Sequence, residues 1–244
     1  EIEYKYNNEN VIYIAYPNGT LFHTNKGSNV FLNIIKQDGL LLQFIPKQIS
    51  NYSEIAFEAV KQNIEAFKYI KPEDVDNYSE IALYAVTKDG TLLDIISPYT
   101  KDYSKIAFEA VKQNTLAFHY INPNNVDNYF EIALYALKKD CYLITHISPN
   151  YPKYNLLVLN VAKSNPEILT HINYNNLNIN REAIFPILSE NNQAKAYIPH
   201  NVSQKASFKI KYINYTTVKK LRNNILKLHH KNFSVHNDNK GKKK

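Results

Sequence analysis

The chain has 244 residues, 44% of them apolar, which is enough for a buried core in one large or two small domains. Cys141 is the only cysteine, which excludes an intrachain disulfide and any zinc site built from cysteines alone. The net charge of +7 is unevenly placed: residues 205–244 hold 12 Lys and Arg against one acidic residue, and residues 1–204 hold 17 basic and 21 acidic residues. A mildly acidic body therefore precedes a strongly basic tail.

The N-terminal segment 1–26 predicts a small two-stranded β-hairpin that caps the rest of the fold. Residues 11–16 and 20–23 are rich in β-branched and aromatic side chains, and Pro17-Asn18-Gly19 between them is a turn signal. The segment lacks the basic start and apolar run of a secretory signal. No stretch of the chain approaches the roughly 18 apolar residues of a membrane helix, so we expect an intracellular protein without a transmembrane segment.

Residues 27–204 carry an internal repeat of about 25 residues. Segment 52–63 recurs almost unchanged as segment 103–114, and segment 78–86 recurs as segment 129–137. The resemblance is thus strongest between copies 51 residues apart, which indicates a duplicated pair of unlike repeats, A and B. Five of the copies open with a tyrosine. These leading tyrosines are Tyr52, Tyr78, Tyr103, Tyr129 and Tyr154.

Each copy reads as a longer helix followed by a shorter one. Ile55, Ala56, Ala59 and Val60 form a wide helical stripe, which is typical of a helix buried between two neighbours. An Asn or Asp column then breaks the helix with residues that tolerate left-handed or turn geometry, and the same residues suit the N-cap of the shorter helix. We expect an all-α fold, a right-handed α-solenoid of about seven helix-turn-helix repeats, because one 25-residue unit cannot bury its own apolar face.

The C-terminal segment 205–244 predicts a basic helix and a disordered tail. Residues 216–230 place Val218, Leu221, Ile225 and Leu228 at helical 3–4 spacing, and the chain turns polar after Lys231.

The histidines are interpreted as packing residues. His146 and His171 share a repeat column with tyrosines and an isoleucine, and His119 lies one position earlier. Such a column is typical of a semi-buried position, and no third ligand is evident beside a histidine pair that could bridge adjacent repeats through a metal. We therefore expect no metal and no cofactor.

No catalytic residues are predicted, and the chain is expected not to be an enzyme. Cys141 and His146 are four apart, as a nucleophile and its base could be, but both occupy structural columns and no oxyanion-hole motif accompanies them. Neither glycine-rich phosphate-binding motif occurs, and the carboxylates are spread over repeat-related surface positions. No small-molecule substrate is evident.

The leading tyrosines are predicted to pack inward as staples. The alternative is a stacking platform for single-stranded nucleic acid, but the acidic repeat body disfavours phosphate binding.

A partner surface is predicted where repeat columns vary in chemistry while the frame holds. Tyr84 and Tyr135 are expected on the outward side of the longer helices, with Lys88, Lys138 and Lys139 nearby, and tyrosine among charges is typical of binding hot spots. The alternative is that both tyrosines merely cover a groove.

The basic tail has three interpretations: a solvated extension, attachment to nucleic acid or an acidic protein, or contact with an anionic membrane. The candidate tail residues are Lys219, Lys220, Arg222, Lys227, Lys242, Lys243 and Lys244.

The repeat pattern Tyr-x-x-Ile-Ala-x-x-Ala-Val-Lys-Gln-Asn-x-x-Ala-Phe-x-Tyr-Ile, at residues 52–70 and 103–121, resembles a family of short tandem helical repeats of unknown function. That family occurs in giant amoeba-infecting viruses and amoeba-dwelling intracellular bacteria. The resemblance covers about residues 27–200 and implies an all-α repeat fold, no catalytic residues to transfer, and a viral or effector-like origin, hence a host cytoplasm or a virion.

Two functions are compatible with these patterns. The first is a non-enzymatic scaffold that binds a protein partner, and the second is a nucleic-acid-associated or virion protein whose solenoid positions the lysine-rich tail.

Overall fold

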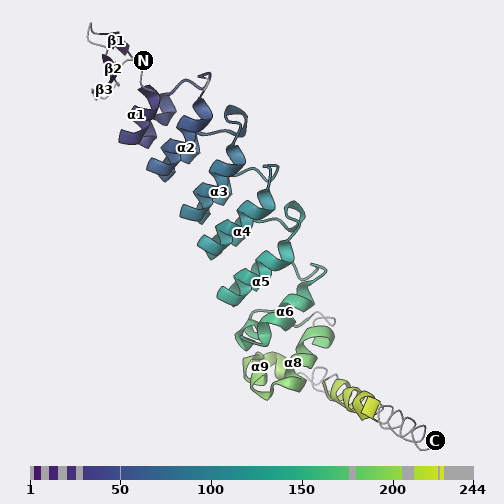
Figure 1. Ribbon diagram of the computed structural model, residues 1–244. Helices are drawn as coiled ribbons and strands as arrows, with labels where there is room; N and C mark the ends of the chain where they lie inside the picture. Colours follow the sequence, from purple (N-terminus) through teal and green to yellow (C-terminus); the bar gives the residue numbers. More distant parts are fainter. Residues whose placement is uncertain are drawn as a thin grey trace, which may run out of the picture. The chain divides into compact units, whose positions relative to one another are not determined.

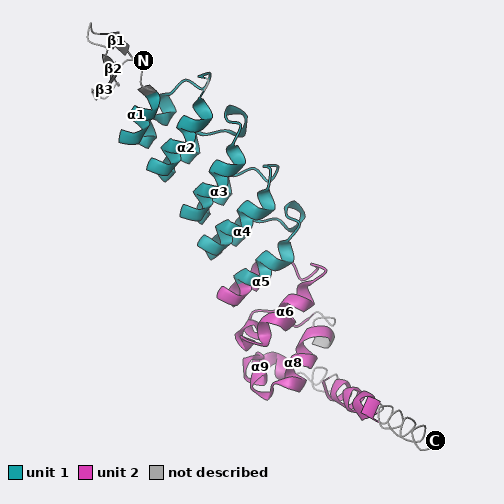
Figure 2. Ribbon diagram, viewed as in Figure 1, with its two compact units in different colours: residues 1–136 teal, residues 137–244 magenta. Residues whose placement is uncertain are grey.

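The computed structural model describes residues 3–6, 11–15, 21–25, 30–49, 51–175, 180–204, 212–224 and 226–227. The chain divides into two compact units, residues 1–136 and residues 137–244 (Figure 2). In the described residues no helix is both long and apolar enough to cross a membrane.

Unit 1 begins with three short strands, β1 (Glu3–Tyr6), β2 (Val11–Ala15) and β3 (Leu21–Asn25). They pair antiparallel in the order β1-β2-β3, with Ile14 opposite both Tyr4 and Phe22. The sequence patterns had indicated only the second and third strands. The residues of the predicted turn between them, 17–19, lie outside the described part of the chain.

The rest of unit 1 is a row of regularly spaced helical hairpins, with helices α1 to α5 side by side in chain order (Figure 1). A hairpin comprises one α-helix and the 3₁₀ helix after it. The hairpins are α1 (Val30–Gln37) with η1 (Gly39–Phe44), α2 (Tyr52–Gln62) with η2 (Ile64–Tyr69), α3 (Tyr78–Lys88) with η4 (Gly90–Ile95), and α4 (Tyr103–Gln113) with η5 (Thr115–Tyr120). Helix α5 (Tyr129–Lys139) follows, and its last three residues belong to unit 2. Short 3₁₀ turns η3 (Pro72–Asp74) and η6 (Pro123–Asn125) lie in two of the links.

The two-helix interpretation of each repeat is confirmed, and the shorter helix proves to be a 3₁₀ helix of six residues. In η2 and η5 the residue that follows, Ile70 or Ile121, takes an extended backbone and is buried. The shorter helix therefore ends where an isoleucine must enter the core. So short a segment suits 3₁₀ geometry, whose eclipsed side chains and poorer hydrogen bonds disfavour long runs.

The core of unit 1 consists of the apolar columns that the sequence predicted. Ile55, Ile81, Ile106 and Ile132 are all fully buried. The alanine columns are fully buried as well, and their members are Ala56, Ala59, Ala82, Ala85, Ala107, Ala110, Ala133 and Ala136. Because alanine adds only a methyl group, these columns let the backbones of neighbouring helices approach closely. Burial on both sides of each helix follows from this stacking.

The leading tyrosines are buried, as predicted. They are between 3% and 7% exposed, which excludes them as a platform for bases. Phe67 packs against Tyr78 and Phe118 against Tyr129, with ring centroids 5.8 and 5.7 Å apart. Burial raises the pKa of Tyr52, with a smaller contribution from Asp74, to about 12. Tyr78 and Tyr129 thus anchor their helices against the hairpin before them.

The Asn/Asp column caps the 3₁₀ helices, as predicted. In every described hairpin its side-chain oxygen accepts a hydrogen bond from the backbone N–H two residues on, at 2.9–3.1 Å. The expectation of left-handed or turn geometry at this column is wrong. Asn63 has φ −143° and ψ 116°, and Asn114 has φ −140° and ψ 112°, which is extended backbone. Side-chain chemistry, not backbone tolerance, therefore selects Asn or Asp here.

Replacement of Asn114 by alanine should lower the free energy of unfolding by about 1 kcal/mol, because the N–H of Leu116 loses its acceptor. Urea unfolding followed by circular dichroism measures the change. Asn114→Asp is the matched control, since Asp89 and Asp140 make the same bond in their own hairpins. Equal losses in the two variants would contradict the capping role.

The interfaces between hairpins alternate in closeness. Helix α1 packs on α2, and α3 on α4, more extensively than α2 packs on α3. At the closer interfaces a glutamine reaches back to the preceding hairpin. The Gln113 side chain accepts from the N–H of Gly90 at 2.7 Å and donates to the Lys88 carbonyl at 3.0 Å. Gln62 makes the equivalent pair of bonds to Gly39 and Gln37. This alternation gives the 51-residue period a physical basis.

Unit 2 continues with helical elements that become less regular toward its C-terminal end. They are η7 (Cys141–His146), α6 (Tyr154–Ala162), η8 (Pro166–Thr170), the π-helical turn η9 (Asn180–Ile184), α8 (Phe185–Glu190), η10 (Asn192–Tyr197) and α9 (His200–Ser203). Its core uses the same columns, with Leu157, Val158 and Val161 fully buried.

The basic helix occupies residues 212–224, so it begins four residues earlier than predicted. Its predicted apolar stripe is not buried: Val218 is 64% and Leu221 57% exposed, while Ile225 and Leu228 lie outside the residues with described side chains. Two tyrosines make the contacts instead. The rings of Tyr212 and Tyr215 pack on Phe185 with centroids 5.7 and 5.6 Å away. The predicted disordered stretch after Lys231 lies outside the described residues.

Candidate functional site

The first candidate site is a surface of aromatic rings and lysines on helices α2 to α5 of unit 1. Phe57 of α2 meets Tyr84 of α3 edge to face, with ring centroids 5.6 Å apart and planes at 77°. Phe108 of α4 meets Tyr135 of α5 in the same way, at 5.8 Å and 80°. All four rings are half-buried. The duplicated AB pair therefore presents the same ring pair twice.

Lysines lie over these rings. The Lys61 ammonium is 4.2 Å from the centre of the Phe57 ring, and the Lys112 ammonium is 4.5 Å from that of Phe108. Lys61 also pairs with Glu58 at 2.7 Å, and that hydrogen bond raises the pKa of the Lys61 ammonium above its ordinary value. Aromatic faces attract cations, so each ring helps to hold its lysine in place.

The five predicted partner residues comprise two half-buried tyrosines and three exposed lysines. Tyr84 and Tyr135 are half-buried, so part of each ring covers its phenylalanine neighbour and part stays accessible. Lys88 is exposed, with its ammonium 5.4 Å from the centre of the Tyr84 ring. Lys138 and Lys139 are exposed in the last turn of α5. We call the unit 1 residues among these the ring–lysine surface: Phe57, Lys61, Tyr84, Lys88, Phe108, Lys112 and Tyr135.

A second apolar feature of unit 1 was missed in the sequence. The last position of each 3₁₀ helix was interpreted as semi-buried packing, which holds for Tyr69, but Ile95 is 52% and Tyr120 43% exposed. Leu116, on the same 3₁₀ helix as Tyr120, is 56% exposed. A signal was present, because this column exchanges aliphatic, aromatic and imidazole side chains freely, as a core position would not. His119 and His146 are likewise exposed.

The basic-tail residues do not form one set. Lys219 contacts the body of unit 2: its ammonium donates to Ser189 Oγ at 2.8 Å and pairs with Glu190 at 3.3 Å. Lys220, Arg222 and Lys227 are exposed. Lys242, Lys243 and Lys244 lie outside the described residues. Lys219 therefore has a structural role that its sequence position did not indicate.

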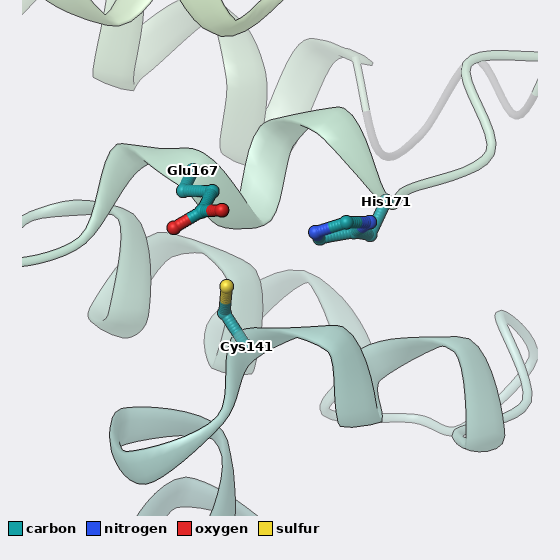
Figure 3. A group of neighbouring side chains, drawn as sticks. All are labelled: Cys141, Glu167 and His171. Carbon is teal, nitrogen blue, oxygen red and sulfur yellow. The ribbon is translucent and has the colours of Figure 1, made fainter.

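The third candidate site is a side-chain cluster in unit 2. Cys141, Glu167 and His171 place one sulfur, one oxygen and one nitrogen atom within 4.8 Å of one another. Figure 3 shows the carboxylate of Glu167 and the ring of His171 turned toward the sulfur. Sequence spacing had paired Cys141 only with His146, as a nucleophile and its base, and had offered no third ligand beside the histidine pair. The structure instead brings together residues of successive 3₁₀ helices, whose proximity depends on how the repeats stack.

The Cys141 thiol is not set up as a nucleophile. Burial raises the pKa of the thiol, and the charges of Glu167 and Asp140 raise it further, against smaller opposing contributions that include a hydrogen bond from Asn165. Reactive cysteines need the opposite environment, with a neighbouring cation that lowers the pKa. The cluster is therefore better suited to holding a cation than to covalent catalysis.

The described fold and these surfaces define a helical-repeat protein. Residues 29–73 and 104–152 match a family described only as a domain of unknown function, DUF4116. Each matched segment spans two successive hairpins, so the similarity is to a tandem repeat of that family. No curated protein and no solved structure matches the chain significantly.

Proposed function

We propose that the chain is a non-enzymatic repeat scaffold that binds a protein partner through the ring–lysine surface. The observation that carries this proposal is the recurrence of one arrangement, an edge-to-face ring pair with lysines, in two consecutive AB pairs. Aromatic side chains at the centre of a surface and charges around them are typical of binding hot spots. A repeat array can present such a motif at a fixed spacing.

The chemistry of the surface favours an acidic partner segment with apolar side chains. Lys88 is exposed, so a carboxylate could reach it without dismantling the ion pair of Lys61. The half-exposed tyrosine edges would take the apolar groups. Complementary charge would mainly raise the association rate and fix the register of the partner, while the rings would supply the affinity.

The proposal also includes the arrangement of the repeats and the origin of the protein. The repeats would form one right-handed solenoid of about seven copies over residues 27–204, with the N-terminal strands as its cap. The resemblance to repeats of giant viruses and amoeba-dwelling bacteria supports an effector-like or virion role inside a host cell.

The double variant Tyr84→Ala/Tyr135→Ala should bind the partner at least about tenfold more weakly than the native chain, since each truncated hot spot costs upward of about 1 kcal/mol. An immobilised native chain first captures the partner from host extract, and its affinity for each purified variant is then measured. Tyr99→Ala is the matched control, because Tyr99 is 98% exposed and lies outside the surface.

A second variant guards against simple misfolding of the alanine variant. Lys88→Gln removes one exposed charge, so its thermal unfolding should be native-like while its affinity falls. Unchanged affinity in both the tyrosine and the lysine variants would rule out the ring–lysine surface.

The alternative function is attachment to nucleic acid through the basic helix. It is favoured by the exposure of Lys220, Arg222 and Lys227 on residues 212–227. Lys220→Glu/Arg222→Glu/Lys227→Glu leaves the contacts of Lys219 and Tyr212 intact. If the captured ligand is nucleic acid, this triple variant should abolish binding, and the affinity of the native chain should fall steeply with salt.

A further inference from the structure

We propose that Cys141, Glu167 and His171 of unit 2 bind a single divalent metal ion of the zinc class, with water completing a four-coordinate site. The three side chains offer a thiolate, a carboxylate and an imidazole, the donor types that zinc takes in proteins. This inference is independent of the ring–lysine surface, which lies on other elements.

The spacing of the donor atoms suits one ion. In a tetrahedral zinc site with bonds of about 2.0–2.3 Å, ligand atoms lie about 3.5 Å apart. The three atoms of the cluster are already within 4.8 Å of one another, so side-chain adjustment of about an ångström closes the site. So small a change does not require the backbone to move. Cys141 is the first residue of η7, Glu167 lies in η8, and His171 is the C-cap residue of η8.

Neighbouring groups orient the donors. The Tyr142 ring meets the His171 ring edge to face, with centroids 5.4 Å apart and planes at 84°. Asn165 hydrogen-bonds the thiol of Cys141, and the same Asn165 caps η8 through the N–H of Glu167 at 3.1 Å. Such outer contacts fix ligand orientation and raise metal affinity. Cys141 is buried and His171 half-buried, whereas Glu167 is exposed, which leaves a side open for the ion and its water.

The repeat frame provides an internal comparison. The three ligands are the residue after the Asn/Asp cap in one hairpin, and the second and sixth residues after the cap in the next. The equivalent sets are Gly39/Glu65/Tyr69, Ile64/Thr91/Ile95, Gly90/Leu116/Tyr120, Thr115/Tyr142/His146 and Pro166/Gln193/Tyr197. None of these sets between residues 39 and 198 holds more than one metal-binding side chain. Metal-binding side chains thus occupy all three positions at one boundary only, and the repeat frame itself does not require them there.

The test is a titration of the metal-free 244-residue chain with Co²⁺, a spectroscopic stand-in for Zn²⁺. We expect one equivalent of Co²⁺ to produce a thiolate-to-metal charge-transfer band and the visible bands of tetrahedral cobalt, and Zn²⁺ to abolish both. Zn²⁺ should also raise the melting temperature of the native chain, because a ligand that binds the folded state stabilises it.

Three variants make the outcome decisive. Cys141→Ser should remove the charge-transfer band, and His171→Ala should weaken Co²⁺ binding by at least about tenfold. His146→Ala is the matched control, since His146 occupies the same repeat column and also contacts Tyr142, with ring centroids 6.2 Å apart. Absence of the band in the native chain, or an equal loss in His146→Ala and His171→Ala, would overturn the proposal.

Discussion

Replacement of Gly90 by alanine should lower the free energy of unfolding by about 2–4 kcal/mol, combining overpacking with loss of a hydrogen bond. A Cβ atom at position 90 would lie 2.4 Å from the carbonyl oxygen of Ala110, in the helix of the next hairpin. Since that oxygen belongs to the backbone, relief requires α3 and α4 to separate. Their separation would also stretch the bonds of Gln113 to Gly90 and Lys88. Urea unfolding monitored by circular dichroism measures the loss.

The control for this variant is Thr115→Ala, the same repeat position in the following hairpin. Thr115 already carries a Cβ atom and is half-buried, so the free energy of unfolding should change by less than about 1 kcal/mol. If Gly90→Ala proved as mild as Thr115→Ala, the close approach of α3 and α4 would not be an important constraint.

Much of the fold was predictable because the signals are local. The stripe of Ile55, Ala56, Ala59 and Val60 follows helical spacing, and all four side chains are buried as expected. Each Asn or Asp cap bonds a backbone N–H only two residues away, so the residue type in that repeat column was enough to predict it. What the sequence could not supply is the distance between successive hairpins. Gly90 lets the backbone of the next hairpin approach, and nothing within its own repeat indicates this.

The candidate sites were harder to predict for the same reason. Tyr84 and Tyr135 were found because one column alternated in chemistry, but their phenylalanine partners come from the preceding hairpin and could not be inferred from spacing along the chain. Cys141 was compared with His146, four residues away, although Glu167 and His171 are the side chains that reach it. Contacts between repeats depend on the offset of one hairpin against the next, which a single copy does not encode.

The alternation of interfaces leads to the second large effect, on deletion of whole repeats. Removal of residues 78–128, one 51-residue pair, joins Asn77 to Tyr129 and leaves an A hairpin followed by a B helix, as in the native order. Removal of residues 78–102 joins two A hairpins instead. Ile64 would then occupy the place of Gly90 against α4, with its Cβ atom against the Ala110 carbonyl. We expect the pair deletion to unfold cooperatively and the single deletion to be strongly destabilised.

The effect of Ile64→Gly on the free energy of unfolding should change sign between these backgrounds, which tests whether the clash at the glycine position destabilises the single deletion. In the native chain Ile64 is half-buried, so Ile64→Gly should lower the free energy of unfolding by about 1 kcal/mol or more. In the pair deletion, where a B helix still follows, the same change should also destabilise. In the single deletion, however, Ile64→Gly should restore about 2–4 kcal/mol, because it recreates the glycine that the glutamine of α4 requires. If Ile64→Gly were destabilising in all three backgrounds, the two kinds of interface would be interchangeable, and the 51-residue period would be a trace of duplication without a structural constraint.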